Sequence, residues 1–258
     1  MAELITSTSN PKIKKLVALQ QKSSERRESS LFVVEGRREL EHCLNSGFEL
    51  DTVFVCPEIF EGRLPSADRT VEVSRELYRK IAYREGTEGI IAEVRYRQSR
   101  LEDLRLRENA LIAVLESVEK PGNLGAVLRS ADASGVDAVI VCDPLTDMYN
   151  PNLIRSSIGA IFTVPVATAS SEETIKWLKD KGIKIYTAQL QDSEWYYDTD
   201  MRQGTAIVMG TEATGLTDVW RKAADAHIKI PMLGKLDSLN VSVSAAILMF
   251  EAVRQRNL

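Results

Sequence analysis

The sequence has few of the residues that build disulfide frameworks or metal sites. It contains three cysteines, Cys43, Cys56 and Cys142, an odd number with no Cys-x-x-Cys pair. Such usage is typical of free buried thiols in a reducing compartment. The two histidines, His42 and His227, have no cysteine or second histidine at metal-ligand spacing. We therefore expect no disulfides and no bound metal.

Long apolar runs and nucleotide-binding fingerprints are also lacking. No run is long enough to span a bilayer, and no charged-then-apolar signal stretch opens the chain. Both absences favour a cytoplasmic protein without membrane contact. No Gly-x-Gly-x-x-Gly occurs, and the Gly210–Gly215 loop lacks the Gly-Lys-Ser/Thr ending of a phosphate-binding loop. The pattern argues against a generic nucleotide-binding dehydrogenase.

The net charge of the chain is small, but basic side chains are concentrated in one segment. The net charge is −4, yet residues 1–109 carry 19 basic and 19 acidic side chains, and the acidic excess lies after them. Residues 10–27 hold six basic side chains against Glu25 alone. A phosphate backbone responds to such local density, so this segment is a candidate RNA contact. A solvated helix face would have the same composition.

At 258 residues the chain is long enough for two modest domains. The first part predicts a small α/β domain over residues 1–95. Highly charged residues 96–109 predict a linker. Residues 110–258 predict a second domain. In the first domain Asn10-Pro11 opens a helical pattern, and the further expected elements are strands 31–34, 52–55 and 90–94 and helices 37–44 and 74–82.

The second part alternates regularly between strand and helix patterns. Such alternation predicts a mostly parallel sheet covered by helices on both faces. The expected strands are 111–115, 138–141, 164–167, 183–187, 206–209 and 228–230. The expected helices are 124–134, 151–161, 172–181, 217–224 and 240–256, and Ser170-x-x-Glu173 forms a capping box before the third of them.

Three unusual segments follow three of these strands directly: 116–123, 210–215 and 231–238. Because the carboxyl ends of parallel strands meet at one edge of the sheet, we expect these segments to form one composite pocket. Individually their residues are ambiguous. Asn123 has the properties of a helix N-cap, and Arg129 those of a surface ion-pair residue. A Gly-x-x-x-x-Gly loop is weak evidence for any function.

In combination the motifs are specific. Asn123-Leu-Gly-Ala-Val-Leu-Arg129, Gly210-Thr-Glu-Ala-Thr-Gly215 and Ile230-Pro-Met-Leu-Gly-Lys-Leu-Asp-Ser-Leu-Asn-Val-Ser242 stand in the order and spacing of the SpoU/TrmH-type SPOUT methyltransferases, which the chain resembles over residues 110–256. Residues 5–94 look, more loosely, like the substrate-binding domain that precedes the catalytic domain in many rRNA-directed members.

This resemblance implies an α/β SPOUT catalytic domain with a C-terminal trefoil knot, homodimerisation, and S-adenosylmethionine as methyl donor, with no metal. The reaction it implies is methyl transfer to a ribose 2′-hydroxyl of RNA. Carried over by position, the residues of the reaction centre are Arg129, Asn123, Glu212, Ser238 and Asn240. Those expected around S-adenosylmethionine are Gly210, Ile230, Leu239, Met232 and Thr187. Those expected on RNA are Lys12, Lys14, Lys15, Arg26 and Arg27.

Arg129 is the residue that the family assigns to the 2′-hydroxyl. A guanidinium is a poor base in water, so we expect it to anchor a substrate phosphate and to polarise the hydroxyl by its charge. The proton then passes to a phosphate oxygen or to a transiently neutral Arg129, and the sequence leaves both routes open.

The separate first domain favours 23S rRNA as the substrate. A tRNA 2′-O-ribose methyltransferase and a non-catalytic RNA-binding protein of the same fold are the alternatives. Intact Arg129, Glu212, Ser238 and Asn240 argue against the non-catalytic alternative. The loop around Glu119-Lys120 departs from the Asp-Pro of many relatives, so the methylated nucleotide stays open.

Overall fold

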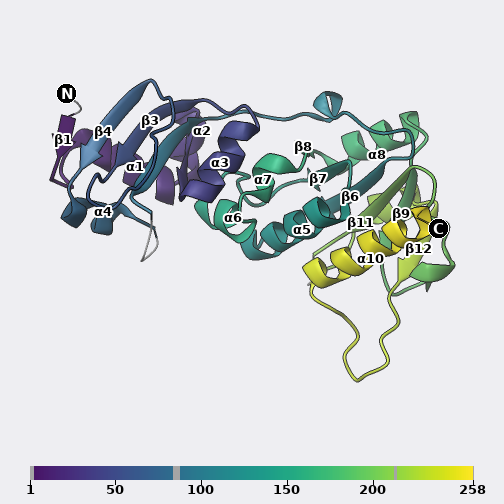
Figure 1. Cartoon of the computed structure of the whole chain (residues 1–258). Coiled ribbons are helices and arrows are strands. Elements are labelled where there is room, and N and C mark those ends of the chain that lie inside the picture. Colours follow the sequence, from purple (N-terminus) through teal and green to yellow (C-terminus); the bar gives the residue numbers. More distant parts are fainter. Residues whose placement is uncertain (1–2, 84–87, 212–213, 258) are drawn as a thin grey trace. The chain divides into compact units, whose positions relative to one another are not determined.

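A computed structural model describes residues 3–83, 88–211 and 214–257. The chain divides into two compact units (Figure 1). The first comprises Met1–Arg97 together with Asp147–Thr163, and the second comprises Gln98–Thr146 together with Val164–Leu258. None of the described helices is long and apolar enough to cross a membrane.

The first unit is built on a mixed five-stranded sheet of the described residues, in the order β1-β4-β3-β5-β2. β5 runs antiparallel to both of its neighbours, and the other pairs are parallel. The strands are β1 (Glu3–Ile5), β2 (Leu31–Glu35), β3 (Leu50–Val55), β4 (Arg69–Val73) and β5 (Ile90–Arg95).

Helices α1 (Pro11–Gln21), α2 (Ser23–Ser29), α3 (Arg37–Asn45) and α4 (Arg75–Ile81) complete the N-terminal part of this unit. The predicted start of α1 is confirmed, because the Asn10 side chain accepts a hydrogen bond from the Lys12 N–H at 2.9 Å. The apolar residues of α1 and α4 pack with those of the strands in one core.

A later segment of the chain also packs into the first unit. It carries α6 (Pro151–Ser156) and α7 (Ala160–Thr163). The Tyr149 ring stacks on Phe32 with 4.1 Å between centroids, and the Tyr149 hydroxyl donates to the Arg97 carbonyl oxygen at 2.6 Å. The two compact units therefore differ from the predicted stretches, in which this segment fell within 110–258.

The prediction of one continuous helix over 151–161 is wrong. Ile158 and Gly159 both have positive φ, at 56° and 83°, and separate α6 from α7. A left-handed residue interrupts the helical hydrogen-bond ladder, and two in succession end it.

The second unit contains a seven-stranded sheet of the described residues, in the order β10-β12-β9-β11-β6-β7-β8. All its pairs are parallel, as predicted. The strands are β6 (Leu111–Glu116), β7 (Ala138–Cys142), β8 (Val166–Ala169), β9 (Lys184–Ala188), β10 (Glu194–Trp195), β11 (Thr205–Met209) and β12 (Ala226–Lys229). β8 begins two residues later than expected.

Two groups of helices cover this sheet. α5 (Pro121–Ser134) and α10 (Val241–Arg256) lie side by side (Figure 1), and α8 (Ser171–Asp180) packs with α9 (Asp218–Ala223). The capping box predicted for α8 is confirmed, since Ser170 and Glu173 exchange both hydrogen bonds. Two short 3-10 turns, η1 (Leu101–Asp103) and η2 (Tyr196–Asp198), complete the described elements.

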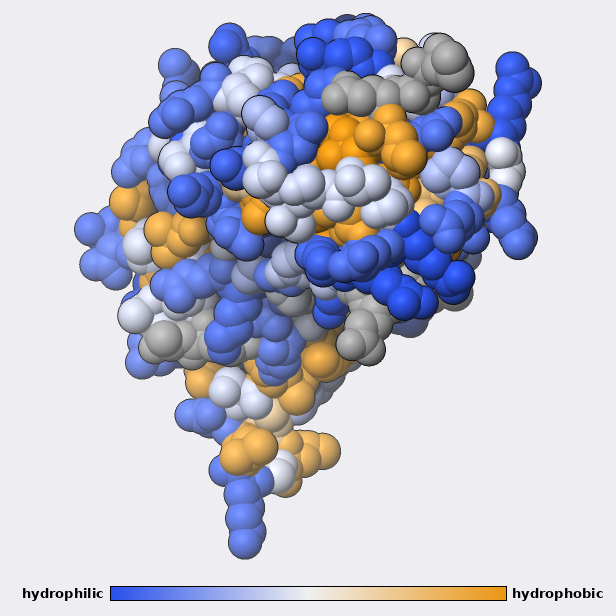
Figure 2. Space-filling view, turned by 90° about the vertical axis from the view of Figure 1, so that its left-hand side faces the viewer, coloured by the Kyte–Doolittle hydropathy of each residue, from blue (hydrophilic) through white to orange (hydrophobic). Residues whose placement is uncertain are grey.

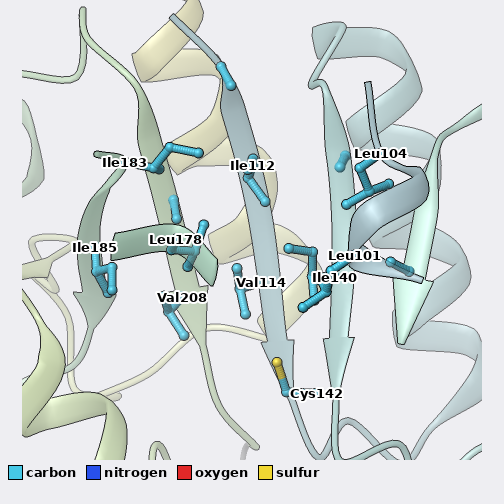
Figure 3. Close-up of a cluster of buried hydrophobic side chains, with 14 of the residues drawn as sticks. Leu101, Leu104, Ile112, Val114, Ile140, Cys142, Leu178, Ile183, Ile185 and Val208 are labelled. Carbon is cyan, nitrogen blue, oxygen red and sulfur yellow. The ribbon is translucent and has the colours of Figure 1, made fainter. Parts of the chain in front are cut away.

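Figure 3 shows the core on the face that carries α8 and η1. Ile112, Val114 and Ile140 project from β6 and β7 toward Leu178 of α8. Leu101 and Leu104, from the predicted linker, are buried in the same cluster. The end of the linker is therefore fixed to the second unit by apolar packing.

Candidate active site

The carboxyl ends of β12, β9, β11 and β6 lie next to one another at one edge of the parallel sheet. The segments that follow β6, β11 and β12 therefore reach that edge together, as the strand pattern predicts.

The loop after β11 needs both of its glycines. A Cβ at Gly210 would stand 2.2 Å from the Gly215 carbonyl oxygen, a distance that no side chain can adopt. Gly215 has φ +66°, and its N–H donates to the Thr211 carbonyl oxygen at 3.0 Å. This turn is tight enough that only glycine fits. Glu212, expected in the reaction centre, lies outside the described residues.

The end of this loop is held by a buried carboxylate of β6. Glu116 accepts hydrogen bonds from the Thr217 N–H at 2.9 Å and from the Thr217 hydroxyl at 2.7 Å. Glu116 is not among the site residues predicted from the sequence. The sequence feature that points to Glu116 is its place at the end of an otherwise apolar strand. A charged side chain buried there requires hydrogen-bonding partners.

The start of α10 joins the first and third motifs. The Asn240 side chain caps α10 by accepting from the Ser242 N–H at 3.0 Å, and its Nδ2 donates to Asn123 Oδ1 at 3.1 Å. The structure thus places together two residues that are 117 positions apart in the sequence. Ser238 lies just before this cap, is exposed, and donates to Asp237 Oδ1 at 3.2 Å.

Helix α5 begins earlier than expected. Its N-cap is Lys120 and Pro121 is its first residue, so Asn123 lies inside the first turn rather than at the cap. The Asn123 side chain can therefore accept the hydrogen bond from Asn240 instead of capping α5. Arg129 lies further along α5 and is exposed. Within the described parts of the chain, no hydrogen bond or ion pair of the Arg129 side chain is recorded, so the surface ion pair considered for it is not formed there.

A cavity of about 590 Å³ opens at this edge of the sheet. Four of the residues expected around S-adenosylmethionine line it, namely Gly210, Ile230, Met232 and Leu239, and so do Ser238 and Asn240. The volume is typical of a site for a small organic ligand.

Thr187, also expected near S-adenosylmethionine, is not among the described residues that line the cavity. Its side chain is fully buried, and its hydroxyl is hydrogen-bonded to His227 Nδ1 at 2.6 Å, within the sheet. Because side chains alternate along a strand, the next residue, Ala188, lines the cavity instead.

Several lining residues were not anticipated from the sequence. Gln189 follows β9, Lys229 ends β12 and Arg221 lies on α9. Two buried polar atoms among them, Gln189 Oε1 and Arg221 Nε, have no hydrogen-bond partner among the described residues. Gln189 and Lys229 could have been predicted from their positions at the ends of strands. No sequence feature distinguishes Arg221 as a lining residue.

The basic segment of the first unit is only partly available for RNA. Lys12, Lys14 and Arg27 are exposed, whereas Lys15 donates to the Glu93 carboxylate at 3.0 Å. Arg26 is buried, pairs with Asp147, and donates to the Leu19 carbonyl oxygen at 2.6 Å. Arg26 does not fit an RNA contact, because all of this bonding is internal to the unit.

Metal-binding geometry is not found in the described ranges 3–83, 88–211 and 214–257. No group of three or more His, Cys, Asp or Glu side chains is close enough there to hold an ion. Burial raises the pKa of the Cys142 thiol to about 12, so this cysteine is neutral at physiological pH.

Comparison with known proteins divides the chain into two consecutive stretches, close to those predicted from the sequence. Residues 110–250 match the SpoU rRNA methylase family, and residues 10–92 match the MRM3-like substrate binding domain. The 23S rRNA (guanosine(2553)-2′-O)-methyltransferase RlmP of Bacillus subtilis (strain 168) is 30% identical over 250 residues, which cover 95% of this chain and 97% of that protein.

Two solved structures are similar over nearly their whole length. An RNA 2′-O ribose methyltransferase is 39% identical with a TM-score of 0.86, covering 99% of this chain and 100% of that one. The S-adenosylmethionine-bound rRNA methyltransferase from Sinorhizobium meliloti is 28% identical with a TM-score of 0.88, covering 98% of each chain.

Proposed function

Since this chain belongs to the SpoU rRNA methylase family, we propose that it transfers a methyl group from S-adenosylmethionine to a ribose 2′-hydroxyl of 23S rRNA. It is an S-adenosylmethionine-dependent rRNA 2′-O-methyltransferase. The observation that carries this conclusion is the match to the SpoU rRNA methylase family over residues 110–250. The Asn240–Asn123 hydrogen bond agrees with it, because it joins the helix of Arg129 to the edge of a ligand-sized cavity.

The cavity fits the methyl donor. It combines apolar side chains with two buried polar atoms that lack partners among the described residues, and S-adenosylmethionine has both apolar and hydrogen-bonding parts. Gly210, Ile230, Met232 and Leu239 would hold it. When bound, it supplies an activated sulfonium methyl group.

The protein's own contribution is to align and polarise the ribose hydroxyl. Arg129 binds a substrate phosphate and stabilises the developing negative charge on the 2′-oxygen. Asn240 and Asn123 fix the approach of the ribose, and Ser238 hydrogen-bonds the RNA backbone. Alignment of the attacking oxygen with the methyl group lowers the barrier by several kcal/mol, roughly 7–11 in favourable cases.

The first unit binds the RNA around the target nucleotide. Lys12, Lys14 and Arg27 are exposed, and Lys15 is half-buried beside Glu93. Each cation that neutralises a phosphate releases counterions, so binding is expected to weaken steeply with salt. Arg26 takes no part in this contact.

The chain acts as a homodimer in the cytoplasm. Apolar side chains of α10 and of the loop before it are exposed: Val243 at 46%, Phe250 at 47%, Leu233 at 97% and Leu236 at 77%. The loop between β12 and α10 projects at the lower end of Figure 1, and Figure 2 shows hydrophobic residues at the same end. A second copy would cover such a surface. The loops after β11 and β12 would form the trefoil knot of the family.

Transfer of labelled methyl from S-adenosylmethionine to unmodified 23S rRNA and to tRNA, assayed separately, tests the substrate. Labelling of 23S rRNA at a single nucleotide is expected. Labelling of tRNA alone would keep the chemistry and overturn the substrate. Cofactor binding without transfer to either RNA would favour the non-catalytic RNA-binding protein.

A further inference from the structure

Arg221 is a cation of the cavity with no counterion among the described residues. It lies on α9, is half-buried, and lines the cavity. Over the described residues its guanidinium has no hydrogen bond or ion pair, and its Nε is buried without a partner. A partly desolvated guanidinium without an anion is unfavourable, so the protein's own described side chains are an incomplete environment for Arg221.

The other charged residues of the lining do not resolve this imbalance. The Lys229 ammonium lies over the Trp195 ring, 4.8 Å from its centroid, and adds a second positive charge. Asp237 is exposed and accepts a hydrogen bond from the Ser238 hydroxyl, beside the start of α10. Among the described lining residues, cations therefore outnumber anions by two to one.

This charge pattern constrains how a methyl donor lies in the cavity. S-adenosylmethionine carries two positive groups, the sulfonium and the α-ammonium, and one negative group, the α-carboxylate. Arg221 repels the first two and attracts the third. A guanidinium also matches the planar geometry of a carboxylate, with which it can form two parallel hydrogen bonds.

We propose that Arg221 binds the α-carboxylate of S-adenosylmethionine, and that it thereby orients the amino-acid end of the methyl donor. Gln189 lines the same cavity, and its Oε1 is an unsatisfied acceptor suited to the neighbouring α-ammonium. This assignment rests on the proposed function, and it makes Arg221 a binding residue rather than a catalytic one.

Three ligands separate the possible contacts of Arg221. S-adenosylmethionine has the carboxylate, decarboxylated S-adenosylmethionine lacks it, and 5′-methylthioadenosine lacks the whole amino-acid end. The affinity of the full-length chain for each is measured by calorimetry, for the wild type and for Arg221→Gln. Lys222→Gln is the matched control, because Lys222 is the next residue of α9, is exposed, and does not line the cavity.

Arg221→Gln is expected to weaken S-adenosylmethionine binding by about 10- to 100-fold, as for loss of a charged hydrogen bond. Binding of the decarboxylated donor should not weaken, because Arg221 only repels its two positive groups, and binding of 5′-methylthioadenosine should stay within about 2-fold of the wild type. Arg221→Lys, which keeps the charge, should restore part of the loss. Lys222→Gln should change none of the three affinities.

Other outcomes overturn the assignment. Equal loss for all three ligands would mean that Arg221 supports the structure of the cavity or contacts the nucleoside. Unchanged affinity for S-adenosylmethionine would show that the carboxylate lies elsewhere. A wild type that binds none of the ligands would refute the proposed function itself, and the assignment with it.

Discussion

Three basic side chains of the first unit contrast with two arginines of the second unit in whether they have an acidic partner among the described residues. In the first unit Arg26 pairs with Asp147, Lys15 with Glu93 and Arg69 with Asp51, and the acid of each pair is buried. In the second unit Arg129 and Arg221 have no recorded partner among the described residues. Charge content alone does not distinguish these cases. A paired buried cation stabilises the fold, whereas an unpaired cation at a sheet edge is available for a ligand.

The strongest expected effect is on a paired cation. Arg26→Ala should lower the free energy of unfolding of the first unit by about 3–5 kcal/mol, because it leaves the buried Asp147 carboxylate without its partner. All three tryptophans, at positions 177, 195 and 220, lie in the second unit. The unfolding transition of the first unit, followed by circular dichroism, should therefore move to a lower denaturant concentration. The transition followed by tryptophan fluorescence should keep its midpoint. A shared shift would show that the units unfold together.

Arg129→Ala should reduce methyl transfer and leave the stability of the protein unchanged. Methyl transfer to 23S rRNA should fall by about 100- to 1,000-fold, the usual cost of losing one donor to a developing oxyanion. Unfolding and S-adenosylmethionine affinity should match the wild type, because the described structure gives Arg129 neither an internal partner nor a place in the cavity lining. Single-turnover transfer and calorimetry measure the two properties. Loss of cofactor affinity would contradict the assignment.

Acid should destabilise the second unit through a paired residue. Burial alone would raise the pKa of Asp137, but hydrogen bonds from Arg107 and from the Leu111 N–H outweigh it and lower that pKa. Asp137 therefore stabilises the fold above the ordinary Asp pKa of about 3.9, and this contribution is lost as the pH falls through the lowered value.

The comparison that isolates this effect is Asp137→Asn. The unfolding free energy of the variant should vary less between about pH 5 and 3 than that of the wild type, since asparagine does not titrate. Equal slopes would mean that Asp137 is not responsible.

The smallest expected effect is on an exposed cation. Lys14→Ala should leave stability unchanged and weaken RNA binding modestly, with the slope of log affinity against log salt reduced by about 1. Lys179→Ala serves as a control, because Lys179 is an exposed lysine of α8 and lies outside the basic segment. If Lys14→Ala left the salt dependence unchanged, Lys14 would not neutralise a phosphate.

Much of this architecture is predictable from local pattern. The apolar runs of β6, β7 and β11 are fully buried, which is why they read as strands of a parallel sheet. The short or polar elements β1, α2, β4 and β10 were missed. β4 is an Arg-Thr-Val-Glu-Val sequence with only two buried residues, and β10 has two residues in all.

The site residues, too, are predictable only where they belong to a local sequence pattern. Gly210, Ile230, Met232 and Leu239 all line the cavity, and the sequence singles them out because they belong to motifs. Arg26 and Lys14 look alike in the sequence, and only the distant Asp147 separates a buried pair from an exposed charge. Likewise, the packing of Tyr149 on Phe32 depends on a contact between residues more than a hundred positions apart. Such pairings are tertiary, so local sequence does not encode them.

This enzyme methylates a ribose of rRNA. The most direct test is nucleoside analysis of 23S rRNA after incubation with the wild-type protein and labelled S-adenosylmethionine, with Arg129→Ala as the blank. The label should appear in a single 2′-O-methylnucleoside and be absent with the variant. Label on a base, or equal labelling by Arg129→Ala, would contradict the account.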